Sequence, residues 1–117
     1  MALTPEPMLL NYHEQLTRRS LAYHRLVAER VRRDPSLLKV ASINLLRWRA
    51  ASGTRAPSYL AEWETILAQG LDYALMVATR DNDESDRLRQ STPFAGVLSP
   101  KERWEFLRSW KDGSLNI

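Results

Sequence analysis

Apolar residues recur at helical spacing along the first third of the chain. One face, centred on Leu16, holds Leu9, Tyr12, Tyr23, Val27 and Val31 when successive residues are placed about 100° apart. This pattern predicts a long helix that begins between Thr4 and Met8 and ends near Arg33. Residues 1–7 either form its first turn or are disordered.

A second helix is predicted to follow at once, because Asp34 is a suitable N-cap and Pro35 fits the first helical position. It should run to about Ala51, with Gly53 as a left-handed stop. Its apolar residues face more than one direction: Leu37, Leu38, Ala41, Leu45 and Trp48 form one stripe, whereas Val40 and Ile43 point elsewhere. We therefore expect it to be the central helix, or to present a second face to a partner.

The rest of the chain repeats the helical pattern in shorter pieces. One helix is predicted over 58–69 and another over 71–79. A short helix should follow a polar turn, with Asp81 and Glu84 as its capping box. The last helix is predicted over 100–111, behind a capping box of Ser99 and Glu102. No sustained alternation of apolar and polar residues predicts a strand. The prediction is an all-α fold, a single compact bundle of five to six helices in one domain that spans residues 1–117.

Residues 91–98 form an apolar loop before the last helix. Phe94, Val97 and Leu98 surround Gly96. A segment with so many apolar residues is unlike an ordinary solvated loop. Two interpretations stay open: the loop packs inside the protein and joins two helices, or it forms part of an interface.

Four tryptophans are more than the packing of so small a bundle requires, and Trp and Arg are frequent in binding hot spots. We expect Trp48, Trp63 and Trp104 in the core, and Trp110 either in the core or against a partner. The candidate partner-binding residues are Arg87, Arg89, Gln90, Phe94, Val97, Leu98, Arg103 and Trp110.

The net charge of +3 hides a segregation along the sequence. Residues 18–55 are strongly basic, and residues 58–86 are acidic. Arg18, Arg25 and Arg32 recur every seven residues opposite the apolar stripe of the first helix. They are candidate phosphate-binding residues, or they form a solvated face that pairs with the acidic segment.

Catalytic and metal-binding chemistry is not indicated. There is no Cys, and His13 and His24 lie about 16 Å apart along one helix, too far to share a metal ion. The acidic cluster at Asp81 lacks the spacing of a calcium loop. We therefore predict no enzyme activity and no cofactor. Without a signal sequence or an apolar run of about 20 residues, the chain is expected to be cytoplasmic, with no membrane as partner.

Four blocks of sequence resemble a family of small helical bacterial antitoxins. They are residues 34–38 (DPSLL), 44–48 (NLLRW), 60–63 (LAEW) and, most specifically, 87–104 (RLRQSTPFAGVLSPKERW). The similarity covers about residues 20 to 108. Such proteins are encoded beside a toxin and neutralise it by direct binding. The resemblance thus implies an antitoxin-like function and a cognate toxin as partner, with the class of toxin left open.

The alternative is a small nucleic-acid-binding or autoregulatory protein that uses the basic surface of its first two helices. The exposed apolar positions expected on the second helix disfavour a recognition helix of the helix-turn-helix type, where polar base-reading side chains are needed. A homo-oligomer is the other association that the sequence allows.

Overall fold

The computed structural model describes residues 12–111, which are largely helical and contain no strand. The six α-helices of this range are α1 (Tyr12–Arg33), α2 (Leu38–Ser52), α3 (Ser58–Ala68), α4 (Leu71–Thr79), α5 (Asp83–Arg89) and α6 (Pro100–Lys111). Short 3₁₀ turns, Pro35–Leu37 and Gly53–Arg55, precede and follow α2. The all-α prediction is confirmed, and the predicted start of the first helix lies outside the described residues.

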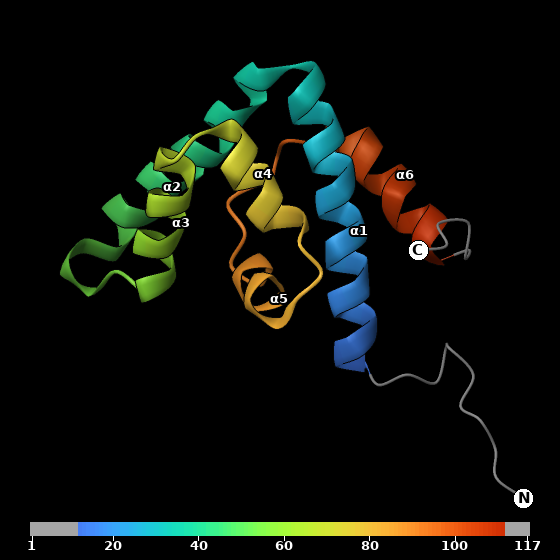
Figure 1. The fold of residues 1–117 in the computed structure, drawn as a ribbon, viewed down its shortest axis with the longest axis horizontal. Helices are drawn as coiled ribbons and strands as arrows, with labels where there is room; N and C mark the ends of the chain where they lie inside the picture. Colours follow the sequence, from blue (N-terminus) through green and yellow to red (C-terminus); the bar gives the residue numbers. More distant parts are fainter. Residues whose placement is uncertain (1–11, 112–117) are drawn as a thin grey trace, which may run out of the picture.

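Helix α4 is the centre of the molecule (Figure 1). It packs against α1, α3 and α5, and it buries Ala74, Leu75, Val77 and Ala78. Helix α2 pairs mainly with α3 and buries only Ala41, Asn44 and Leu45. The expectation that α2 is central was therefore wrong, because α2 covers the core from outside instead of running through it.

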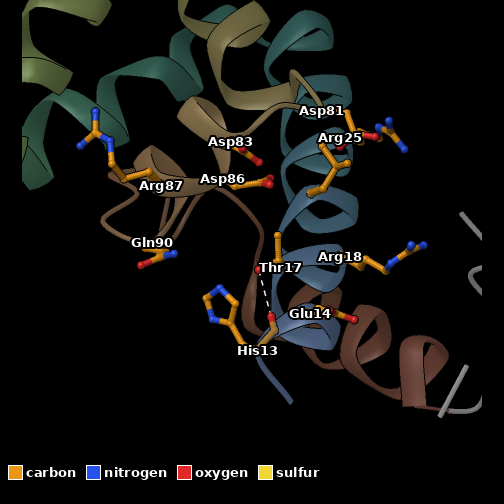
Figure 2. A pocket seen from close by; sticks show the side chains of 11 residues that line it. His13, Glu14, Thr17, Arg18, Arg25, Asp81, Asp83, Asp86, Arg87 and Gln90 are labelled. Atoms are coloured by element: carbon orange, nitrogen blue, oxygen red, sulfur yellow. Dashed lines mark hydrogen bonds between the residues drawn. The ribbon is translucent and has the colours of Figure 1, made fainter. Parts of the chain in front are cut away.

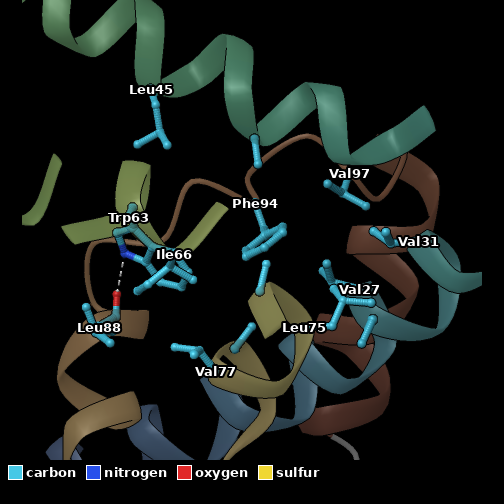
Figure 3. Close-up of a cluster of buried hydrophobic side chains, with 14 of the residues drawn as sticks. Val27, Val31, Leu45, Trp63, Ile66, Leu75, Val77, Leu88, Phe94 and Val97 are labelled. Atoms are coloured by element: carbon cyan, nitrogen blue, oxygen red, sulfur yellow. Dashed lines mark hydrogen bonds between the residues drawn. The ribbon is translucent and has the colours of Figure 1, made fainter. Parts of the chain in front are cut away.

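The core gathers around Phe94, which is fully buried (Figure 3). Its ring meets the edge of Trp63 at a centroid separation of 5.7 Å and that of His24 at 6.0 Å. Val97 and Leu98 of the same loop are also buried, against the core that α1, α2, α3 and α4 supply. The loop 91–98 is therefore part of the core, which is the first of the two interpretations that the sequence allowed.

Local signals set most helix boundaries. Ser99 Oγ accepts from the Glu102 amide at 3.1 Å, and Glu102 accepts from the Ser99 amide at 3.2 Å, which confirms the predicted capping box. Gly53 ends α2 with a φ of +59°, as predicted. At α5 the cap is Asn82, whose side chain accepts from the Ser85 amide at 2.9 Å. The Asp81 cap was thus wrong by one residue.

The tryptophans divide differently from the expectation. Trp63 is fully buried and donates from Nε1 to the Leu88 carbonyl at 3.1 Å, and Trp48 is half-buried against the core. Trp104 is 60% exposed, with the Arg108 guanidinium 5.3 Å from its ring centroid. The core assignment of Trp104 was wrong because α6 turns Phe106 toward the protein.

Candidate partner-binding surface

Polar side chains from two helices fasten the loop 91–98 in place. Asn44 of α2 donates from Nδ2 to the carbonyls of Pro93 and Ala95, both at 2.8 Å. His24 of α1 accepts at Nε2 from the Thr92 hydroxyl at 2.7 Å. The buried carbonyls of a loop need such donors, since they have no partners in a regular helix. The loop is therefore held in the protein by specific bonds as well as by its apolar side chains.

The tautomer of His24 follows from its partners. Its Nδ1 lies 2.7 Å from the Ser20 carbonyl, which can only accept, so Nδ1 carries the proton and Nε2 is free to accept. Burial lowers the pKa of His24 to about 4, although the bond to Ser20 acts in the opposite direction. The imidazole is therefore neutral near pH 7 and is a structural group of the core.

Four of the candidate partner-binding residues lie in the interior. Phe94, Val97 and Leu98 are buried in the core, and Arg89 is buried beside them. The Arg89 guanidinium donates to the carbonyls of Ala78 and Arg80 at the end of α4, and it pairs with Asp86. As partner-binding residues these four are corrected, because their side chains are buried within the protein.

The other four candidates do not form one surface. Arg87 is exposed but pairs with Glu62 at 2.9 Å and with Glu84 at 2.6 Å. It lines a cleft beside α1 together with Gln90, whereas Arg103 lines a separate pocket between α1 and α6. Trp110 is half-buried on α6.

A continuous exposed strip instead runs along α2. Ile43 is 57% exposed and Leu46 is 69% exposed, among the most exposed large apolar side chains in the part of the chain that is described. Lys39 lies four residues before Ile43 and Ala50 four residues after Leu46, so both continue the strip, and Arg47 flanks it. We call these five residues, Lys39, Ile43, Leu46, Arg47 and Ala50, the α2 face. The sequence indicated it through the second apolar direction of this helix, although the expected site lay elsewhere.

The opposite side of α2 fixes how this face is presented. Ala41, Asn44 and Leu45 are buried, and Arg47 donates to Asn44 Oδ1 at 2.5 Å. Arg49 is neutralised by Glu64, at 2.6 Å for the ion pair. Lys39 and Arg47 form no ion pair with the carboxylates of residues 12–111, so the α2 face is apolar in the middle and basic at its border.

The arginines of α1 face a different environment. Arg18, Arg25 and Arg32 are exposed, and none pairs with a carboxylate in the described range. Arg18 and Arg25 line a cleft of about 670 Å³ whose other wall carries Asp81, Asp83 and Asp86 (Figure 2). Figure 2 shows Asp83 and Asp86 turned toward α1. A phosphate held by Arg25 would meet this acidic wall, which weakens the phosphate-binding interpretation.

No group of three His, Asp or Glu side chains within residues 12–111 is arranged to hold a metal ion. None of the helices in this range combines the length and the apolar character that crossing a bilayer requires. No protein-family model, curated protein or solved structure matches the chain.

Proposed function

We propose that this protein is an antitoxin-like binding protein that neutralises a bacterial toxin by direct contact through the α2 face. The observation that supports this proposal is the pair Ile43 and Leu46, adjacent on one helix and mostly exposed. Other long aliphatic side chains of the described chain are buried or half-buried. The resemblance to antitoxins suggests that the partner is a toxin. The cytoplasm is the compartment in which a toxin and its antitoxin would meet.

The free energy expected from burying Ile43 and Leu46 in a complex is of the size found at binding hot spots. Removing a Leu or Ile side chain from water contributes about 1.5–3 kcal/mol, so the two together supply a large part of the free energy of a micromolar complex. Lys39 and Arg47 border the apolar pair without carboxylate partners of their own in the described range. The complementary partner surface is an apolar groove with acidic residues at its rim.

Helix α2 is suited to a groove because it is held rigidly from behind. Asn44 bonds to two loop carbonyls, and Ala41 and Leu45 pack into the core. A helix ordered before binding loses little conformational entropy when it docks. The α2 face therefore presents its apolar anchors at fixed positions.

The test is co-expression with the products of the neighbouring genes. A partner that arrests growth alone, and that co-purifies in fixed stoichiometry with this protein, supports the proposal. The double variant Ile43→Asp, Leu46→Asp should abolish both rescue and co-purification, because it places two charges in an apolar contact. Trp104→Ala is the matched control, since it removes an exposed large apolar side chain from a different helix.

Three outcomes would overturn the proposal. If Trp104→Ala abolishes rescue and the α2 double variant does not, the binding surface lies on α6. If the protein alone forms a dimer that the double variant separates, and no neighbour is toxic, the α2 face serves self-association. Salt-sensitive co-purification with nucleic acid, lost on Arg18→Glu with Arg25→Glu, would favour the nucleic-acid alternative.

A further inference from the structure

A second concave site lies between α1 and α6, away from the α2 face. It is a pocket of about 260 Å³, slightly smaller than a typical small-molecule site of about 300 Å³ or more. Its polar side carries Arg19, Tyr23 and Arg103, and its apolar side carries Leu16, Phe106 and Leu107. Two helices distant in sequence thus bring basic and apolar groups to one small cavity.

Within residues 12–111 the charge of this pocket is uncompensated. Of these residues, two arginines and no Asp or Glu line it. Glu102, next to Arg103 in sequence, is engaged elsewhere: it pairs with Arg30 at 2.5 Å and accepts from the Ser99 amide. Neither Arg19 nor Arg103 pairs with a carboxylate of residues 12–111. This distinguishes the pocket from the cleft at α5, where acidic side chains oppose the arginines.

The buried polar groups beneath the pocket are already satisfied. His24 bonds to Ser20 and Thr92, and the Thr92 hydroxyl also accepts from the Phe94 amide at 3.2 Å. The donors that this lining can still offer to a ligand include the two guanidinium groups and the Tyr23 hydroxyl. Burial raises the pKa of Tyr23, so this hydroxyl stays protonated near pH 7 and can donate.

We propose that this pocket binds a small organic anion, an oxyanion such as a phosphate or a carboxylate carried on an apolar body. The guanidinium groups of Arg19 and Arg103 would hold the oxyanion, because their planar donor pairs match its geometry. Leu16, Phe106 and Leu107 would contact the apolar body. The site shares no residue with the α2 face, so this proposal does not depend on the antitoxin-like function.

The experiment uses phenyl phosphate, benzoate and inorganic phosphate as probes of the purified full chain. Isothermal titration calorimetry at physiological salt gives the affinities, and NMR of the arginine Nε–H groups reports which side chains respond. We expect saturable binding of at least one aromatic probe, with phenyl phosphate binding more tightly than inorganic phosphate because its ring is buried. The comparison with benzoate shows which oxyanion the site prefers.

Variants locate the site. Arg19→Gln and Arg103→Gln should each weaken phenyl phosphate about tenfold or more, as expected for the loss of a charge-assisted bond. Arg18→Gln is the matched control: it removes the same charge from the neighbouring position of α1, which does not line this pocket. Leu107→Ser should weaken phenyl phosphate but leave inorganic phosphate unchanged. Thermal melting of each variant confirms that it folds.

Three results would overturn the proposal. An equal loss for Arg18→Gln and Arg19→Gln would mean that the anion is attracted by the net charge alone. The absence of saturable binding of every probe below about 10 mM would mean that there is no site. Arginine Nε–H shifts confined to residues outside the pocket would place the anion elsewhere, a readout that needs no variant to fold.

Discussion

Two regions of this chain with apolar side chains, the loop 91–98 and the α2 face, differ in burial: the first lies in the core and the second is exposed to solvent. The loop contains no helix, yet Phe94, Val97 and Leu98 are buried at the centre of the protein. Helix α2 is regular and nine of its fifteen residues are apolar, yet it leaves Ile43 and Leu46 exposed. Apolar character alone therefore does not separate core from surface in this protein.

What separates the two regions is the supply of hydrogen-bond donors. A loop enters a core only when its backbone carbonyls find partners, and here Asn44 provides two bonds. The His24–Thr92 bond adds a third link. A helix satisfies its own backbone and can lie at the edge of the core with one face in solvent. The buried polar residues around the loop thus mark it as interior.

The largest expected effect is at the centre of the loop. Phe94→Ala should lower the free energy of unfolding by about 3–5 kcal/mol, because it removes a fully buried ring and leaves a cavity between Trp63 and His24. Urea denaturation followed by tryptophan fluorescence measures it. A loss below about 1 kcal/mol would contradict the central position of the loop.

Acid should destabilise the same region through His24. The folded pKa of about 4 lies below the ordinary value of 6.5, so between these pH values the unfolded chain binds a proton that the folded chain does not. The free energy of unfolding should therefore fall as the pH falls through this window, by on the order of 3 kcal/mol. Denaturation curves across this range should show this slope, and His24→Gln should remove it whatever the overall stability of the variant.

Loss of the Asn44 side-chain amide, which donates from α2 to the loop, should lower the free energy of unfolding almost as much. Asn44→Ala leaves the carbonyls of Pro93 and Ala95 without their partner, and we expect a loss of about 1–3 kcal/mol. Ser42→Ala, an exposed position on the same helix, is the control and should change stability by less than about 0.5 kcal/mol. Equal effects of the two substitutions would show that Asn44 does not fasten the loop.

A smaller effect is expected where the loop meets α6. Ser99→Ala removes the capping hydroxyl that accepts from the Glu102 amide, at a cost of about 1 kcal/mol. Ser58→Ala, near the start of α3, removes a hydroxyl that makes no capping bond and should cost less. Thermal melting of the two variants compares their stabilities directly. A larger loss for Ser58→Ala than for Ser99→Ala would mean that the cap at Ser99 does not stabilise α6.

The same contrast explains which features could be predicted from the sequence. Periodicity, Ser99 and Gly53 act within a few residues, so the helices could be predicted nearly to their ends. The burial of Phe94 depends on His24 of α1 and Trp63 of α3, which are far away in the sequence, and its interior position could not be derived locally. Trp104 and Phe106 lie two residues apart on α6, and only the position of α1 decides which is buried. The α2 face was only indicated by the second apolar direction of its helix, because which of these residues stay exposed depends on how α2 packs against the core.

The smallest expected effect on stability is at the α2 face. Ile43→Ser with Leu46→Ser should change the free energy of unfolding by less than about 1 kcal/mol, because both side chains are mostly in solvent already. The same double variant should weaken a partner complex by tenfold or more, since each lost apolar contact is worth about 1.5 kcal/mol or more. Urea denaturation and partner titration on one protein sample give both numbers. A large loss of stability would mean that these side chains support the fold. The claim that the α2 face, unlike the loop 91–98, lies outside the core would then be wrong.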